Sequence, residues 1–259
     1  KSQNIKFETF ADIFAGTGTV ANHFYNSSKV IVNDILVSNN YIYQAFFGKD
    51  EIRENKLKER LKFYNTLDIK KYNDNYFSNN FSNTYFDANN AKKIGIIRDD
   101  IEKLFEKKII TKREKSYLFT SLIYALDKIA NTVGQYDAYL KHIGKSSYDK
   151  TGKHLSDSNI YKRIELKMPI IIFDGNNEVF NTDANKLIKE IKCDVLYLDP
   201  PYNHRQYIDS YHILENIIRW EKPPVFGKTK KFQRDHLKSR YSKKGHAMYA
   251  LEDLINNAK

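Results

Sequence analysis

The stretch from Val195 to Tyr202, with the sequence VLYLDPPY, constrains the fold more than any other part of the chain. Its apolar run leads directly into Asp-Pro-Pro-Tyr, and an apolar run that ends at a turn signal indicates a strand of a parallel sheet, buried on both faces. Each proline fixes its own φ and restricts the residue before it, so the strand ends here. We therefore expect Asp199 at the carboxyl end of a central strand, where open α/β sheets bind their ligands.

The turn after this strand carries three groups that suit one kind of ligand. Prolines have no N–H, so the carbonyls of Asp199 and Pro200 lose one local partner and can face a ligand. A carboxylate, a carbonyl and the ring of Tyr202 suit a planar group with an NH2, because the two oxygens accept its hydrogens while the ring stacks on its face. The alternative is a simple strand-ending turn with a buried aspartate. The second proline and the tyrosine favour the ligand site.

A second ligand-binding pattern lies near the start of the chain. Residues 7–14 are typical of a strand, the sequence AGTGT follows, and a helix through about Tyr25 comes next. This arrangement lets the backbone approach a ligand at a helix N-terminus. The next strand, over residues 30–34, ends at Asp34, where a carboxylate can accept both hydroxyls of a ribose. The alternative role for Asp34 is to cap a helix over residues 36–47.

The two patterns resemble motifs of a known class of enzymes. Asp-Pro-Pro-Tyr after an apolar strand resembles motif IV of the DNA amino-methyltransferases, which methylate adenine N6 or cytosine N4. The spacing of Asp12, Phe14, Gly16 and Gly18 resembles motif I of S-adenosylmethionine-dependent methyltransferases. The order of the motifs, with an insertion between them, resembles the alpha group of adenine-N6 methyltransferases.

Residues 127–140 and 194–215 are most similar to the modification methylases that partner type II restriction enzymes. The resemblance implies site-specific methylation of adenine N6 in double-stranded DNA, with S-adenosylmethionine as the cofactor. It also implies a restriction endonuclease that acts on the same site as a further partner. The catalytic residues that it implies are Asp199, Pro200, Pro201 and Tyr202, and the cofactor-binding residues are Asp12, Phe14, Ala15, Gly16, Thr17, Gly18, Asp34, Ile35, Asp183 and Ala184.

Asp183 is assigned by its place in the family's order of motifs. In this family, an acid that ends the strand before motif IV binds the adenine amino group of the cofactor. Asp183 ends a strand-like stretch over residues 178–183 and precedes a predicted helix at 184–191, so it is our choice. Asp174, which follows the apolar run at 169–173, is the rival.

The region between the two motifs has a different pattern. Apolar residues at helical spacing predict amphipathic helices from about Ile52 and from about Ile94, whereas residues 71–90 show no clear period. Thr111-x-x-Glu114 predicts a capping box that opens a further helix. We therefore expect an α/β protein with a Rossmann-like methyltransferase sheet, built from residues 1–49 and 168–259. Residues 50–167 form a mainly helical insertion, the candidate target-recognition region.

The charge of the chain favours a polyanion as partner. Its 43 Lys and Arg against 32 Asp and Glu give a net charge of +11. Residues 222–246 hold nine Lys or Arg and one acid, which indicates either a mobile solvated loop or a loop that contacts phosphates. The polar stretch 131–162 has the same two interpretations. The residues that we expect to contact nucleic acid are Asn203, Arg205, Lys228, Lys230, Lys231 and Arg234, and a predicted helix over 207–220 supports the site.

Further features of the sequence limit the kind of protein that we predict. Cys193 is the single cysteine, so no disulfide is expected and its role is core packing. The seven histidines show no metal-ligand spacing, and we predict no metal. We see neither an apolar run of membrane length nor a signal peptide, and we expect a bacterial cytoplasmic protein without membrane contact. The family's segments before motif I and beyond motif IV are missing, so we expect a chain that is incomplete at both ends.

Three alternative functions stay open. An RNA adenine methyltransferase shares both motifs. A protein-glutamine methyltransferase usually carries Asn at the position of Asp199 and does not need the basic run at 222–246. A binding-only subunit with a methyltransferase fold is the non-enzymatic alternative, and the intact Gly16, Gly18, Asp34 and Asp199 disfavour it.

Overall fold

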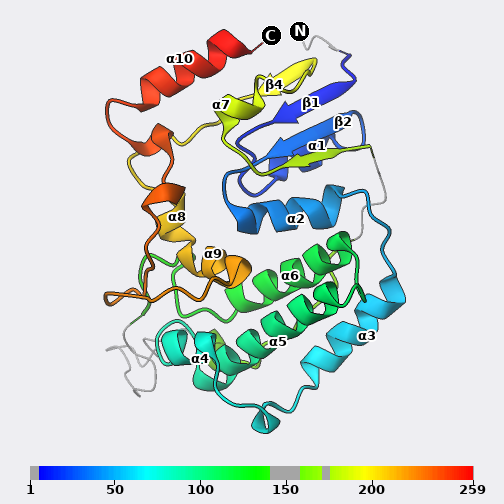
Figure 1. Cartoon of the computed structure of the whole chain (residues 1–259), viewed down its shortest axis with the longest axis vertical. Helices are drawn as coiled ribbons and strands as arrows, with labels where there is room; N and C mark the ends of the chain where they lie inside the picture. Colours follow the sequence, from blue (N-terminus) through cyan, green and yellow to red (C-terminus); the bar gives the residue numbers. More distant parts are fainter. Residues whose placement is uncertain (1–5, 141–157, 171–175, 259) are drawn as a thin grey trace, which may run out of the picture. The chain divides into compact units, whose positions relative to one another are not determined.

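The computed structural model describes residues 6–140, 158–170 and 176–258, and its chain divides into two compact units (Figure 1). The first unit consists of residues 1–50, 171–207 and 234–259, and the second of residues 51–170 and 208–233. The first segment of the second unit, residues 51–170, is close to the insertion predicted at 50–167. Residues 208–233, which the sequence assigned to the catalytic domain, instead belong to the second unit.

A four-stranded parallel sheet forms the centre of the first unit, with the order β3-β2-β1-β4. In the register of the sheet, Asp12 is opposite Val32 on one side and Tyr197 on the other. This mixed architecture confirms the predicted α/β class. The strands are β1 (Thr9–Asp12), β2 (Lys29–Asn33), β3 (Glu178–Phe180) and β4 (Val195–Tyr197).

The position of β4 corrects the first prediction from the sequence. Among the described residues β4 pairs with β1 alone, so it is an edge strand and not a central one. Its residues are half-buried or exposed, and Tyr197 is 37% exposed. The burial of a strand depends on the neighbours at both of its edges, and an apolar run in the sequence does not encode them.

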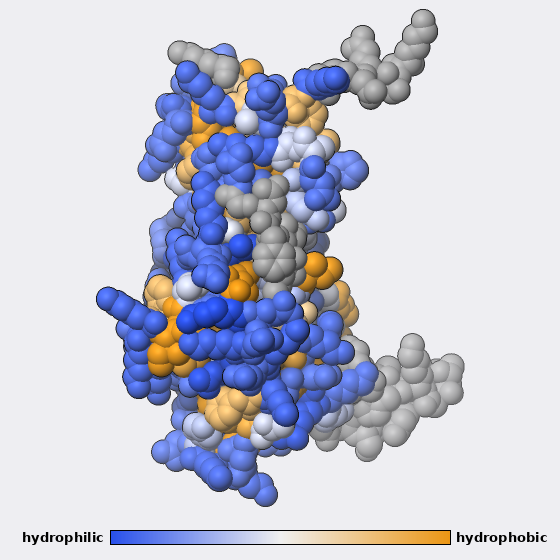
Figure 2. All heavy atoms as spheres, turned by 90° about the vertical axis from the view of Figure 1, so that its right-hand side faces the viewer, coloured by the Kyte–Doolittle hydropathy of each residue, from blue (hydrophilic) through white to orange (hydrophobic). Residues whose placement is uncertain are grey.

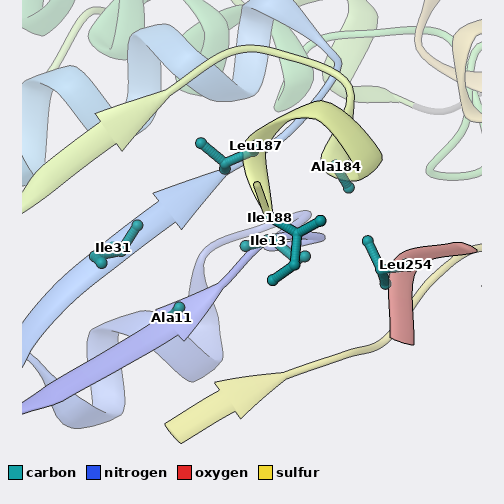
Figure 3. Packing of buried hydrophobic residues seen from close by; sticks show 7 residues of the cluster. All are labelled: Ala11, Ile13, Ile31, Ala184, Leu187, Ile188 and Leu254. Atoms are coloured by element: carbon teal, nitrogen blue, oxygen red, sulfur yellow. The ribbon is translucent and has the colours of Figure 1, made fainter. Parts of the chain in front are cut away.

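Helices cover both faces of the sheet because the side chains of each strand alternate between the faces. Val30 and Val32 pack with residues of α1 (Thr19–Phe24) and α2 (Val37–Phe47). Ile31, between them, belongs to a second cluster that involves α7 (Ala184–Leu187) and α10 (Ala247–Asn257), shown in Figure 3. Cys193 packs against this second cluster, as predicted. The buried members of the cluster are Ala11, Ile13, Ile31, Ala184, Leu187, Ile188 and Leu254.

Two predicted helices differ in the structure. The helix expected over 184–191 is only the four-residue α7, whose first turn is capped by Asp183. The helix expected over 207–220 is broken at Tyr211 into α8 (Tyr207–Ser210) and α9 (His212–Arg219). The basic run contains the short 3-10 helices η3 (Asp235–Leu237) and η4 (Arg240–Ser242).

The second unit is helical, as predicted. The capping box of Thr111 and Glu114 is present at the start of α6. The sequence missed α4, although Asn75 and Ser78 form a capping box there and supply a local signal. The elements are α3 (Glu54–Asn65), η1 (Ile69–Lys71), α4 (Tyr76–Phe81), α5 (Ala88–Glu106), α6 (Lys112–Asp127), η2 (Ser158–Tyr161) and α9.

Hydrophilic residues dominate the face drawn in Figure 2, and the apolar residues there lie in separate patches. In the part of the chain that the structure describes, none of the helices has the length and apolar character to cross a membrane. Most of the strand predicted at 169–173, its neighbour Asp174 and most of the polar stretch 131–162 lie outside the described residues.

Candidate active site

The carboxyl ends of β1, β2 and β4 meet at one edge of the sheet, because the three strands are parallel neighbours. The glycine turn follows β1, Asp34 follows β2, and Asp199 comes two residues after β4. Asp12 interacts electrostatically with Asp34 and with Asp199. Ligands of open α/β sheets bind at this edge. The structure therefore brings together the two sequence patterns that lie far apart in the chain.

The glycine turn has the backbone geometry that its sequence predicts. Gly16 and Gly18 have φ values of 52° and 75°, in the left-handed region that favours glycine. The Gly18 N–H donates to the Ala15 carbonyl at 2.7 Å, which closes the turn, and α1 begins at Thr19. Thr17 is the exposed residue at the tip. The turn thus presents backbone, without a Cβ at Gly16 or Gly18, at the end of β1.

Asp34 holds backbone on two sides. One carboxylate oxygen accepts the Gly16 N–H at 2.9 Å and the other accepts the Leu36 N–H at 2.8 Å. Leu36 precedes α2, and no side chain caps that helix. The alternative role of Asp34 as the cap of this helix is therefore wrong. Ile35, next to it, is 44% exposed, so an apolar side chain faces the solvent beside the site.

Asp12 is a buried carboxylate with an unusual environment. Its side chain is 1% exposed, and its Oδ1 atom has no hydrogen-bond partner among the described residues. The pKa of Asp12 is raised to about 7, mainly by burial and additionally by the charges of Asp34 and Asp199, against the N–H groups of Phe14 and Ala21, which lower it. A buried carboxylate without a partner is costly, and a cation that bound here would relieve that cost.

The predicted catalytic turn is open to solvent. Tyr202 is 83% exposed and Asp199 is also exposed. Tyr207, which the sequence analysis did not single out, lies within electrostatic reach of both residues. Its pKa is raised, first by burial and then by Tyr202, Asp199 and Asp34. With Tyr207 47% exposed, two aromatic rings stand near Asp199.

The residues assigned to the adenine end of the cofactor are less accessible. Asp183 caps α7 by accepting the Asn185 N–H at 3.0 Å, and it forms an ion pair with Arg240 at 3.3 Å. Ala184 is 6% exposed and lies in the core cluster of Figure 3, which leaves its side chain little surface for a ligand. Arg240 was missed because no local pattern links it to Asp183.

The predicted nucleic-acid contacts fall in both units. Asn203, Arg205 and Arg234 belong to the first unit, where the Asn203 side chain accepts the Arg205 N–H at 2.9 Å. The three lysines belong to the second unit. Lys228 is exposed, whereas Lys231 is half-buried and contacts Asp137 at 3.4 Å and Asp209 at 4.0 Å. Within residues 6–140, 158–170 and 176–258, no group of His, Cys, Asp and Glu side chains is arranged to hold a metal ion.

Comparison with known proteins identifies relatives over nearly the whole chain. Residues 2–258 match the family model of the D12 class N6 adenine-specific DNA methyltransferases. Modification methylase StsI of Streptococcus sanguinis is 38% identical over 96% of this chain and 38% of its own length. Type II methyltransferase M.FokI of Planomicrobium okeanokoites is 31% identical over 99% of this chain and 40% of its own length.

A shorter relative is covered more completely. Type II methyltransferase M.NlaIII of Neisseria lactamica is 33% identical over 97% of this chain and 72% of its own length. The chain thus spans only about two fifths of StsI and M.FokI, at 38% and 40% of their lengths. No solved structure matches the chain significantly.

Proposed function

Because the chain belongs to the D12 class of N6 adenine-specific DNA methyltransferases, we propose that it transfers a methyl group from S-adenosylmethionine to N6 of an adenine in double-stranded DNA. The observation that carries this proposal is the meeting of the glycine turn, Asp34 and Asp199 at one edge of the sheet. A cofactor and a target amine require neighbouring sites, and this edge supplies the groups for both.

The residues after β1 and β2 fit the cofactor. S-adenosylmethionine supplies a methyl group on a positively charged sulfur, and its amino group is also positive near neutral pH. The partnerless Oδ1 of Asp12 fits such a cation. An ionised carboxylate offers about four lone-pair sites, so Asp34 can accept ribose hydroxyls as well as the N–H groups of Gly16 and Leu36. The exposed Ile35 side chain offers an apolar surface to a nucleoside base.

The residues after β4 fit the target base. A stacked adenine does not expose N6 to an in-line methyl donor, so the base is flipped out at a cost of a few kcal/mol. Tyr202 stacks on the flipped base, which contributes about 1–3 kcal/mol by analogy with single-strand binding. Asp199 and the Pro200 carbonyl accept the two hydrogens of the amine and direct its lone pair toward the methyl group.

Positioning is the main catalytic contribution in this mechanism. The amine becomes acidic once it is methylated, so Asp199 need not be a strong base. No covalent nucleophile takes part. Burial, and secondarily Asp194, raises the pKa of Cys193, and this thiol packs against the core.

DNA phosphates are the proposed contacts of Lys228, which is exposed, and of Lys230, which is half-buried. Lys228 and Lys230 lie on a turn that is closed by backbone bonds between Phe226 and Lys231. Lys231 is held by Asp137 and Asp209, so we assign it to the structure of the turn. Replacing Lys228 and Lys230 by Ala should weaken DNA binding alike for all sequences and reduce the salt slope by about 0.9 per contact. An unchanged slope would contradict the assignment, and Lys231→Ala should lower thermal stability instead.

In its biological setting, we propose that the full-length protein is the modification component of a restriction–modification system. It would protect bacterial DNA in the cytoplasm against an endonuclease that acts on the same site. The proposal rests on the family and on relatives named as modification methylases.

The decisive experiment is to sequence DNA from cells that express the full-length protein, with a readout of modified bases. N6-methyladenine at one recurring sequence is the expected result. Unmodified adenine, or modified cytosine, would contradict the proposal. A methyl-transfer assay with purified protein, in which duplex DNA and RNA compete, tests which nucleic acid is the substrate. Duplex DNA should be methylated in preference to RNA.

A further inference from the structure

The peptide group of Gly16 is held by two side chains from different elements. Its N–H donates to Asp34, which follows β2, at 2.9 Å. Its carbonyl accepts the hydroxyl of Tyr43, which lies on α2. Both polar groups of one peptide in the glycine turn are therefore fixed by residues 18 and 27 positions further along the chain.

Tyr43 also supports the other glycine of the turn. A Cβ atom added to Gly18 would lie 3.1 Å from Cε1 and 3.4 Å from Cδ1 of the Tyr43 ring. The ring thus occupies the space directly behind Gly18. Tyr43 is 1% exposed and packs in one cluster with Ala15 and Ala21, which flank the turn on either side.

We propose that Tyr43 is a positioning residue for the cofactor site. Its hydroxyl fixes the carbonyl of Gly16 and its ring fixes the path of the backbone at Gly18, so the turn has one conformation before any ligand binds. Preorganisation of this kind strengthens binding, because the ligand does not have to order the turn. The inference rests on the proposed binding of S-adenosylmethionine at this edge of the sheet.

The chemistry of the hydroxyl agrees with a permanent donor. Burial raises the pKa of Tyr43 well above its ordinary value, and Asp34 and Asp12 raise it further. The phenol is therefore protonated at neutral pH and can donate to the Gly16 carbonyl there. A buried carbonyl that loses such a donor is left unsatisfied.

Tyr43→Phe is the sharpest test, because it removes the hydroxyl and keeps the ring behind Gly18. The matched control is Tyr64→Phe, which removes another hydroxyl of a fully buried tyrosine, bonded to Asp100 at 2.7 Å in the second unit. Tyr43→Phe should raise the KM and the Kd for S-adenosylmethionine about five- to tenfold while kcat at saturating cofactor stays within about twofold. Tyr64→Phe should change neither constant.

Hydrogen exchange provides a readout that does not depend on the cofactor. In the protein without ligand, Tyr43→Phe should speed amide exchange in residues 15–19, and Tyr64→Phe should not. Unchanged exchange and unchanged cofactor affinity in Tyr43→Phe would overturn the inference, as would equal effects of the two substitutions. If exchange changes as expected but the unsubstituted protein binds no S-adenosylmethionine, Tyr43 still positions the turn and the proposed cofactor is wrong.

Discussion

The turn after β1 and the turn after β4 differ in how firmly the protein holds them. At the first, both polar groups of Gly16 are bonded to side chains, and Gly18 is buried against Tyr43. At the second, Tyr202 is 83% exposed, and the side chain of the nearby Asn203 accepts the N–H of Arg205, two positions further along the chain. A small, constant ligand can bind to a rigid turn, whereas a base that arrives with its duplex requires an open one. We therefore assign the rigid turn to the cofactor and the open turn to the target base.

The largest effect should come from the open turn. Asp199→Ala removes the acceptor of the target amine, and methyl transfer to duplex DNA should fall at least about 100-fold, because misplacing a reacting group by about 1 Å already costs that much. Tritiated methyl transfer measures the loss. Glu190→Ala, which removes an exposed acid elsewhere in the first unit, should transfer normally. Near-normal transfer by folded Asp199→Ala protein would refute the assignment of this turn as the active site.

Substitution of Asp34 tests the assignment of the rigid turn after β1 to the cofactor. Asp34→Ala should weaken S-adenosylmethionine binding by about 1–3 kcal/mol, because charge-assisted hydrogen bonds to the ribose are lost. Asp68→Ala is the matched control, since Asp68 likewise accepts the N–H of the residue two positions ahead, but in the second unit. Calorimetry on both folded variants measures their affinity for S-adenosylmethionine. An unchanged affinity in Asp34→Ala would leave Asp34 the role of holding the backbone at Gly16 and Leu36.

Asp12, the last residue of β1, should make the affinity for the cofactor depend on pH. With a pKa of about 7, raised mainly by burial, Asp12 is neutral at pH 6 and becomes negative as the pH rises through 7. A cationic ligand binds the ionised form, so affinity for S-adenosylmethionine should rise about eightfold from pH 6 to pH 7.5. Above that range the ligand's own amino group loses its proton, near pH 7.7–8.0 for an ordinary α-amino group. Asp12→Asn should show no such rise, and a rise that persists in this variant would exclude Asp12 as its source.

Tyr202 tests whether the target base stacks on the turn after β4. Tyr202→Ala should weaken binding of the target duplex by up to about 1–3 kcal/mol, through lost stacking. A mismatched target adenine, which flips more easily, should restore part of the binding. Tyr202→Phe should be nearly neutral, because the ring face stacks and the hydroxyl is not needed. Tyr249→Ala, at a 74% exposed position on α10, is the control. A strong defect in Tyr202→Phe would mean that the hydroxyl, and not the ring face, contacts the DNA.

The turn after β1 shows which features the sequence could predict and which it could not. The glycine turn and the helix after it follow from residues that are adjacent in the chain, and the structure has both close to the predicted positions. The partners of the turn do not follow, because Tyr43 is reached only through the packing of α2 on the sheet. The pair of Asp183 and Arg240 spans 57 positions and has no local signal either.

Burial was the least predictable property. The apolar run before Asp199 predicted a central strand, but β4 has a paired neighbour on one side alone among the described residues. Ala184 was assigned to the cofactor by its place after Asp183, and the structure packs it into the core. In both cases the local pattern could not predict how deeply the residue is buried, because burial depends on elements that are far away in the sequence.

Titration of S-adenosylmethionine into the protein in the absence of DNA tests the central contrast most directly. Calorimetry at pH 7.5 should compare the unsubstituted chain with Asp199→Ala. If the cofactor site is already formed in the free protein and is separate from the target site, both proteins should bind one equivalent of S-adenosylmethionine. Their Kd values should lie within about threefold of each other, which is a difference of less than about 1 kcal/mol. Binding that appears only after DNA is added, or that is lost in folded Asp199→Ala protein, would contradict the account.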